Sequence, residues 1–361
     1  MSNPIQPEDL VFHFLNVGFG DNILIEFPED QNGSRSYGLV DCCDYKKTEG
    51  YLKKLQNLRP GNTNFRFICA THPHYDHISG IDYFLKNPNY KPDEFWDSGF
   101  RHQSKTYMNI IKSIYNEKIQ LVRVSSGMEW NFGKVQVSAL APSIRLRNRY
   151  ATYGVDMNNS SIVLRFEHRK EDYLLIKSLE YKGTKSEEIE RQAGQSVVIL
   201  AGDAEFDSWA YITEEYPRIE GAKEHQPLVK KMINHLACSV IKVSHHGSMH
   251  SSPLDVYEKM NPNIAIISTK QEISTKNIGS FTLERGLFPH PSSVSSLEEI
   301  GATILTNDGC YESSLLPNGQ PKNPNFDHCG TITIVVPPGG KPRYDKLDDD
   351  EHTVKTPPTH V

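Results

Sequence analysis

The chain has 361 residues, with 39 Lys and Arg against 45 Asp and Glu and a formal net charge of -6. This acidic balance excludes a general attraction to nucleic acid or acidic membranes, so any site for a polyanion has to be local. No apolar run approaches the roughly 20 residues that cross a bilayer, and the start lacks a basic and apolar signal segment, so we expect a soluble, cytoplasmic protein.

Short strand-forming runs separated by turn residues open the chain. They cover Val11 to Val17, Ile23 to Phe27, Tyr37 to Asp41 and Phe65 to Ala70. Between the last two, Thr48 to Leu58 carries apolar residues at the spacing of one helix face and is ended by Pro60-Gly61. The first layer is therefore predicted to be a sheet with one helix packed on it.

The rest of the chain continues to mix the two kinds of element. The predicted helices are 78–85, 105–115, 226–237, 254–260 and 294–300, and the predicted strands are 119–124, 134–140, 161–167, 173–179, 196–201, 240–243, 264–268, 303–306 and 331–335. This order favours two sheets packed face to face with helices outside, a four-layer αββα sandwich of the α/β class. We expect one domain over residues 9–336, followed by a disordered acidic, Pro-rich tail over 337–361.

The densest group of chemically capable side chains is Thr71-His72-Pro73-His74-Tyr75-Asp76-His77, directly after the apolar strand Phe65 to Ala70. His72 and His74 are two apart and project to the same side of an extended backbone, and the following turn brings Asp76 and His77 to a second point nearby. Imidazole and carboxylate are ligands that zinc and similar ions favour. The alternative is a His-rich surface loop, in a chain with 15 His.

These residues match the HxHxDH signature, and the chain resembles the metallo-β-lactamase superfamily, in particular its ComEC/Rec2-like branch. Further stretches similar to that branch follow in the same order: Phe14-Leu15-Asn16-Val17-Gly18-Phe19-Gly20-Asp21, Val40-Asp41, Asn158 to Leu164, Leu200-Ala201-Gly202-Asp203, Lys242 to Ser248 with its two histidines, and Pro289-His290-Pro291. The resemblance runs from about Val11 to Thr306. It implies a free-standing version of the branch, because no membrane-spanning part is present.

The resemblance implies a dinuclear centre. His72 and His74 would hold one divalent ion, Asp76 and His77 the other, Asp203 would bridge them, and His245 would complete the second site. Two ions, zinc or else manganese, would lower the pKa of a shared water from about 15.7 toward 7 and so supply hydroxide at neutral pH. Asp203 alone could instead cap the predicted helix Glu205 to Ile212.

Other residues are expected around this centre. Asp41 would orient a ligand histidine, and His246 and His290 would contact a phosphate or protonate the leaving group, unless they only shape the loops around Gly247 and Pro291. Asp76 is expected to act both as a metal ligand and in catalysis. Many family members supply a further histidine to the first ion from mid-chain, and Ala139-Leu140-Ala141-Pro142 offers none, with His102 and His168 as the conceivable substitutes.

The sequence says least about the substrate, since one fold hosts many hydrolytic reactions. The resemblance favours a phosphodiesterase or nuclease acting on a phosphodiester such as DNA. As local support, Arg145, Arg147 and Arg149 form a basic cluster for substrate contact, although a basic loop is usually a solvated face; Asn159 and Ser160 are further candidate contacts. The alternatives are a small-molecule ester, thioester or lactam hydrolase, and a non-catalytic metal-binding subunit. Protein partners and oligomeric state are not indicated by the sequence.

Overall fold

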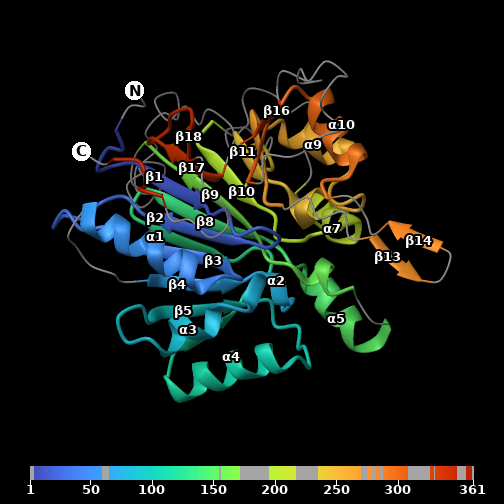
Figure 1. Ribbon diagram of the computed structural model, residues 1–361, viewed down its shortest axis with the longest axis horizontal. Coiled ribbons are helices and arrows are strands. Elements are labelled where there is room, and N and C mark those ends of the chain that lie inside the picture. The colour runs from blue at the N-terminus through green and yellow to red at the C-terminus, as the bar shows by residue number, and fades with distance from the viewer. Residues whose placement is uncertain are drawn as a thin grey trace, which may run out of the picture.

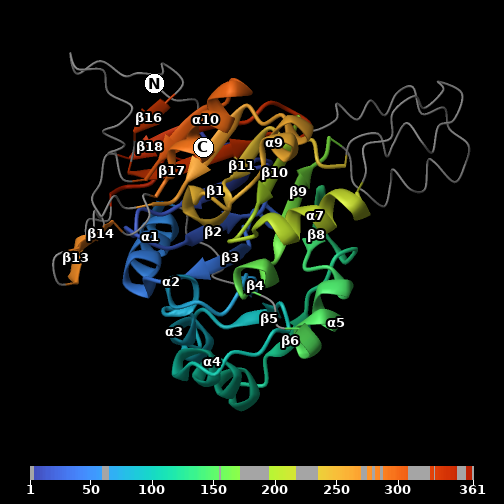
Figure 2. The same cartoon turned by 90° about the vertical axis from the view of Figure 1, so that its right-hand side faces the viewer.

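The computed structural model describes residues 4–58, 65–153, 156–170, 195–216, 235–269, 275–278, 281–284, 288–307, 326–328, 330–347 and 355–359. Within them, two mixed sheets of 8 strands each lie face to face, with a separate hairpin of β13 (Thr275–Ile278) and β14 (Phe281–Glu284) beside them. Figures 1 and 2 show the two sheets in the middle of the molecule and helices on both outer sides. The expected α/β architecture with two sheets between helical layers is confirmed.

The first sheet combines an antiparallel half with a parallel half. Its order is β18 (Arg343–Leu347), β17 (Thr331–Val336), β1 (Leu10–Phe14), β2 (Asn22–Glu26), β3 (Tyr37–Cys42), β4 (Phe65–Ala70), β5 (Pro92–Asp97) and β6 (Gln120–Arg123). The strands from β3 to β6 run parallel, joined by α1 (Tyr45–Leu58), α2 (Tyr75–Ile78), α3 (Ile81–Lys86) and α4 (Lys105–Asn116). Parallel strands end at the same edge, so this half gathers loops at one edge.

The second sheet has the same plan. Its order is β16 (Phe326–His328), β15 (Thr303–Thr306), β12 (Ile264–Ile267), β11 (Val240–Lys242), β10 (Val197–Leu200), β9 (Val163–His168), β8 (Val135–Ala141) and β7 (Glu129–Phe132). The strands β10, β11, β12, β15 and β16 run parallel, and α7 (Phe206–Glu215), α9 (Leu254–Met260) and α10 (Pro291–Glu299) lie between them in sequence. The loops after β10 and β11 therefore share one edge.

Three apolar layers hold the sandwich together. The central layer lies between the sheets and is built from alternate residues of each strand, such as Phe12, Phe67 and Trp96 facing Val137 and Phe166. The opposite faces of the strands bury a second layer under α1, α3 and α4, and a third under α7, α9 and α10. Since β1, β2 and β10 are covered on both faces, they are buried at every position and consist mainly of apolar residues.

Several predicted elements lie within two or three residues of the observed ones, but others were missed. The predicted helix 78–85 is divided into α2 and α3, and β5, β7 and α5 (Ile144–Tyr153) were not predicted. The predicted strand 173–179 and nearly all of the predicted helix 226–237 lie outside the described residues. Among the described helices, none has both the length and the hydropathy of a membrane span.

Part of the predicted tail belongs to the first sheet. Residues Arg343–Leu347 form β18, which pairs with β17 antiparallel from Arg343 opposite Val335 to Leu347 opposite Thr331. Its side chains alternate between half-buried and exposed, and an edge strand tolerates the charges of Arg343, Asp345 and Lys346 because one side of it faces solvent. The backbone of Ile5 also bonds to Thr359, which brings the two ends of the chain together (Figure 1).

Asp97 at the end of β5 gives the folded protein a specific dependence on pH. Burial, only partly offset by the hydroxyl that Tyr107 donates at 3.3 Å, raises the pKa of Asp97 to about 6. The folded state therefore binds the proton more tightly than the unfolded state, whose pKa is about 3.9. The protonated carboxyl of Asp97 therefore stabilises the folded state fully below about pH 3.9. This stabilisation is lost as the pH rises through about 6.

We expect the stability of Asp97→Asn to rise relative to that of wild type between about pH 4 and pH 7.5. The difference in the free energy of unfolding should change by roughly 3 kcal/mol in favour of the variant. Urea denaturation of both proteins in a chelating buffer at the two pH values measures this difference. A difference that stays constant with pH would show that Asp97 is ionised in the folded protein throughout this range.

Candidate metal centre

Four strand ends supply the residues of the centre. Asp41 stands in β3 with a positive φ of 55°, and Thr71 to His77 follow β4 directly. Asp203 follows β10, and η3 (Ser244–Gly247), which holds His245 and His246, follows β11. The first two strands belong to one sheet and the last two to the other, so the centre lies where the parallel halves of both sheets end.

The first set of donor atoms is formed by His72, His74 and Asp203. Nε2 of His72 lies 3.0 Å from Nδ1 of His74 and 3.8 Å from Oδ2 of Asp203. His72 is buried, and its Nδ1 lies 3.2 Å from the hydroxyl oxygen of Thr71, which fixes the ring. Two imidazoles and a carboxylate thus converge on one point.

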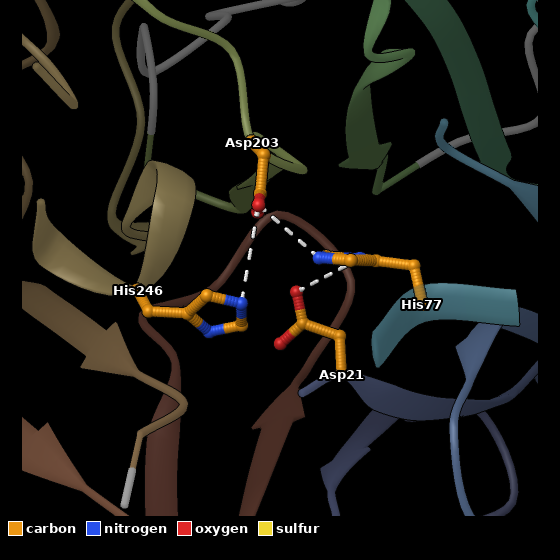
Figure 3. Close-up of side chains that lie close together, drawn as sticks. All are labelled: Asp21, His77, Asp203 and His246. Atoms are coloured by element: carbon orange, nitrogen blue, oxygen red, sulfur yellow. Dashed lines mark ion pairs between the residues drawn. The ribbon is translucent and has the colours of Figure 1, made fainter. Parts of the chain in front are cut away.

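The second set shares the same oxygen of Asp203. Oδ2 of Asp203 lies 3.2 Å from Nε2 of His77 and 3.9 Å from Nε2 of His246. Oδ2 of Asp76 lies 3.8 Å and 3.5 Å from the same two nitrogens. Figure 3 shows His77 and His246 pointing at Asp203 from opposite elements of the chain. Asp203 therefore faces both sets, in the place of a bridge.

The second histidine of this set differs from the one that the resemblance implies. His246 is fully buried with its Nε2 turned toward Asp76 and Asp203, and its Nδ1 bonds to the backbone oxygen of Ser268 at 2.6 Å. His245 is 20% exposed, its Nδ1 is 2.7 Å from Oε1 of Glu205, and its Nε2 is 4.0 Å from Asp203. The structure thus places His246 in the donor set and His245 at its edge.

Asp41 lies behind the second set. Its Oδ2 is 2.8 Å from Nδ1 of His77 and accepts the Thr71 hydroxyl at 2.7 Å, while its Oδ1 accepts the Thr71 backbone N–H at 2.8 Å. A carboxylate at Nδ1 orients the ring and leaves Nε2 for a metal ion. Asp41 thus contacts the His77 ring, and its role in orienting a ligand histidine stays a prediction.

Two buried charged residues of the centre were missed from sequence. Asp21, just before β2, lies 3.7 Å from Nδ1 of His77, and its carboxylate forms an ion pair with Lys242 of β11. Donor atoms of Asp21, His77, Asp203 and His246 all lie within 4.8 Å of one another. A lysine in the apolar run Val240 to Val243 was the signal, because a buried ammonium requires an opposite charge.

Local backbone geometry holds these loops in place. A Cβ on Gly20 would lie 2.5 Å from the backbone oxygen of Asp76, and the N–H of Asp21 donates to that same oxygen at 3.1 Å. His245 and His246 both have positive φ, at 45° and 51°. Non-glycine residues in this region are strained and gather at functional sites, which agrees with their position here.

The donor chemistry fits divalent metal ions. Tetrahedral zinc with bonds of about 2.0–2.2 Å separates neighbouring donors by roughly 3.3–3.6 Å, close to the distances within both sets. Within the described part of the chain, the buried Nε2 atoms of His77 and His246 and Oδ1 of Asp203 have no hydrogen-bond partner. A buried polar atom without a partner is costly, so these atoms are arranged to bind something else. The residues present therefore fit a metal centre with mixed nitrogen and oxygen ligands.

The charges of these groups are strongly coupled. Burial disfavours ionisation of Asp203, but the imidazoles of His77, His246 and His72 overcome it and hold the pKa of Asp203 well below its ordinary value. Burial, reinforced by the charge of His77, lowers the pKa of His72 well below 6.5. An ionised carboxylate and a neutral imidazole are the protonation states that bind metal.

The remaining predicted residues have structural partners. Oδ1 of Asn159 accepts the N–H groups of Glu205 and Ser208 at 3.2 and 3.0 Å, so it caps the start of α7. The Ser160 hydroxyl donates to the backbone oxygen of Met157 at 2.6 Å, and Nδ1 of His290 accepts from the N–H of Ser292 as the N-cap of α10. The N-cap of α7 is Glu205, so the alternative role of Asp203 as a helix cap does not apply.

The two arginines expected near substrate are both engaged within the protein. Arg145 pairs with Glu214 at 2.6 Å on the surface, and Nη2 of Arg147 donates to the backbone oxygens of Ser98 and Val124 at 2.7 and 2.8 Å. His102 is a neighbour of His74, with ring centroids 6.2 Å apart, whereas His168 is buried with its Nδ1 on the Val336 oxygen at 2.7 Å. Of the two substitute histidines, the structure brings only His102 beside the first donor set.

A family model described as the metallo-beta-lactamase superfamily matches residues 39–115, which include His72, His74, Asp76 and His77. The match runs from β3 to α4 and so covers the segment with the densest group of predicted ligands. The family match and the donor sets together make it a metal-dependent hydrolase with the metallo-β-lactamase fold. The comparison with curated proteins found no match.

Solved structures with this fold resemble the chain at low identity. A mutant of the CmlA beta-hydroxylase is 9% identical with a TM-score of 0.39, and the match covers 85% of this chain and 53% of that one. A diphosphatase from the PhnP family is 10% identical with a TM-score of 0.38 and coverages of 90% and 98%. YhfI from Bacillus subtilis is 9% identical with a TM-score of 0.41 and coverages of 83% and 97%.

The chain thus spans about half the length of the first of these proteins and nearly all of the other two. TM-scores in this range carry no argument about activity.

Proposed function

We propose that this metal-dependent hydrolase cleaves phosphodiesters at a dinuclear centre. The observation that carries the proposal is the shared oxygen of Asp203, which faces His72 of one donor set and His77 and His246 of the other. Two ions a few ångströms apart clamp both the attacking and the leaving oxygen of an in-line displacement at phosphorus. The similarity of the sequence motifs to the ComEC/Rec2-like branch agrees with this reaction.

The residues would divide the work as follows. His72, His74 and Asp203 would hold one ion, and Asp76, His77, His246 and Asp203 the other. When bound, the ions supply Lewis-acid polarisation of the substrate and a water of lowered pKa. Zinc is the ion that the mixed imidazole and carboxylate donors favour, with manganese as the alternative.

The protein positions the metal ligands and excludes water from the centre. Asp41 fixes the ring of His77, and the buried positions of His72, His77 and Asp203 lower the local dielectric constant and so strengthen every charge interaction there. His245, held by Glu205 at the partly exposed edge, is placed to hydrogen-bond an oxygen of the substrate.

A small-molecule ester, thioester or lactam hydrolase is the second candidate, and the apolar rim of the centre favours it. Phe19, Tyr75, Phe206 and Met249 are exposed by 41 to 73% and stand within three residues of Asp21, Asp76, Asp203 and His246. The ring of Phe19 lies 4.5 Å from that of His246. With Arg145 and Arg147 engaged elsewhere, such a rim suits an apolar substrate as well as a nucleobase.

An activity panel on metal-loaded protein separates the candidates. We expect hydrolysis of bis-p-nitrophenyl phosphate and of DNA, RNA or cyclic nucleotides after loading with zinc or manganese, and a loss of roughly a thousandfold in Asp76→Ala. Glu298→Ala, a change on α10, is the matched carboxylate control and is expected to keep wild-type activity. Turnover of nitrocefin or acyl-thioesters with all phosphodiesters left intact would select the second candidate.

A further inference from the structure

Lys242 places a positive charge inside a centre built to bind cations. The side chain is fully buried, and its ammonium contacts the carboxylate of Asp21, the backbone oxygen of Gly202 at 3.3 Å and Oδ1 of Asp203 at 3.9 Å. A buried ammonium repels metal ions bound a few ångströms away and so opposes their binding. Its presence therefore calls for a role that outweighs this cost.

The two oxygens of Asp203 face different partners. Oδ1 is turned toward Lys242. Oδ2 is the atom nearest to the imidazoles of His72, His77 and His246, at 3.8, 3.2 and 3.9 Å. The ammonium thus attracts one oxygen and leaves the other for both donor sets, which fixes the orientation of the carboxylate.

Asp21 is near enough to the centre to act as a ligand itself. Its carboxylate falls within 4.8 Å of donor atoms of His77, Asp203 and His246. Its measured approach to His77 is at Nδ1, 3.7 Å away, whereas Asp203 approaches Nε2 (Figure 3). The ion pair with Lys242 engages Asp21 beside Nδ1 of His77, the ring nitrogen that Asp41 also contacts.

We propose that Lys242 is a positioning residue that keeps Asp21 out of the metal coordination and presents Asp203 through Oδ2 alone. The proposal rests on the proposed dinuclear centre. Without the ammonium, Asp21 would be a free carboxylate in a buried site and would turn to the nearest cations, the metal ions. The coordination would gain an oxygen donor at a position that the substrate or water has to occupy.

Lys242→Met is therefore expected to bind divalent ions more tightly while losing activity. Removing the repelling charge and releasing a carboxylate should raise the affinity for cobalt(II) or zinc by roughly tenfold or more, measured by competition with a chromophoric chelator. The cobalt(II) absorption should become weaker in the visible region as the coordination number rises. Hydrolysis of bis-p-nitrophenyl phosphate should fall by roughly a hundredfold.

A second variant covers the case in which a lone buried Asp21 prevents folding. Lys242→Met combined with Asp21→Asn removes both charges, and a neutral pair is tolerated better than half of an ion pair. This double variant is expected to fold and to regain the wild-type cobalt(II) spectrum, because no free carboxylate remains. Lys91→Met, a change of an exposed lysine near Glu117, is the control and should match wild type in every measurement.

The outcomes are distinct. A structural lysine would weaken metal binding when removed, so a folded Lys242→Met that binds ions no more tightly than wild type, with an unchanged spectrum, overturns the proposal. A double variant that folds but keeps an altered spectrum also overturns it. Failure of the wild-type protein to bind metal would instead contradict the proposed function, and it is seen before any variant is made.

Discussion

Asp203→Ala should abolish activity and reduce the metal content of the purified protein from about two ions per chain to one or none. Oδ2 of Asp203 is the atom common to both donor sets, 3.8 Å from Nε2 of His72 and 3.2 Å from Nε2 of His77. Its loss removes a negative ligand from each ion and the connection between them, so we expect a fall in turnover of roughly a thousandfold or more.

Metal analysis by mass spectrometry and turnover of bis-p-nitrophenyl phosphate measure this effect. The control is Asp255→Ala, which removes an exposed carboxylate that pairs with Lys259 on α9 and should leave both quantities unchanged. Melting curves in chelating buffer show whether the variant is folded. A folded Asp203→Ala protein that still holds two ions would mean that another group bridges them.

His246→Ala should have a larger effect on metal binding than His245→Ala. The buried Nε2 of His246 lies 3.5 Å from Oδ2 of Asp76 and has no hydrogen-bond partner among the residues that the structure describes, whereas His245 has its Nδ1 engaged by Glu205. We expect His246→Ala to lose one of the two ions and roughly a hundredfold to a thousandfold in turnover. His245→Ala should keep both ions and lose roughly tenfold to a hundredfold.

Each variant serves as the other's control, since the residues are adjacent and chemically identical. Titration of the metal-free proteins with cobalt(II) gives the number of sites and their affinities. The opposite order, in which His245→Ala loses an ion and His246→Ala keeps both, would restore the ligand assignment implied by the sequence resemblance and would require the η3 turn to rotate on metal binding.

The part of the centre that could be predicted from sequence is the part that is local in the chain. His72, His74, Asp76 and His77 occupy six positions after one buried strand, and the loop geometry alone brings them together. The choice between His245 and His246 could not be made in this way. Both follow β11 and both have positive φ, so the folded turn as a whole determines which ring faces inward.

Residues that meet only through tertiary structure were harder to assign. Asp21 and Lys242 come from different sheets, so their ion pair depends on how the sheets are stacked. Arg145, Arg147 and Asn159 looked available for substrate because their partners, such as Glu214 and the start of α7, are far along the chain. Polar side chains in loops often form such hydrogen bonds within the protein and are then not available to a substrate.

The same reasoning accounts for the fold. Apolar strands covered on both faces, such as β4 and β10, were predicted because burial requires uniform hydrophobicity. β5 begins at Pro92 and carries Asp93 and Glu94, and β18 alternates charged residues, so neither shows the apolar run of a buried strand. Strands whose side chains are partly exposed follow weaker rules of composition, and their pairing is set by the neighbouring strands.

The most direct test is a crystal structure of the protein loaded with zinc or manganese, with anomalous data collected at the absorption edge of the ion. We expect two anomalous peaks, both within bonding distance of Oδ2 of Asp203, one beside His72 and His74 and the other beside Asp76, His77 and His246. Saturated crystals with no peak between these side chains, or with a single peak that does not contact Asp203, would contradict the account.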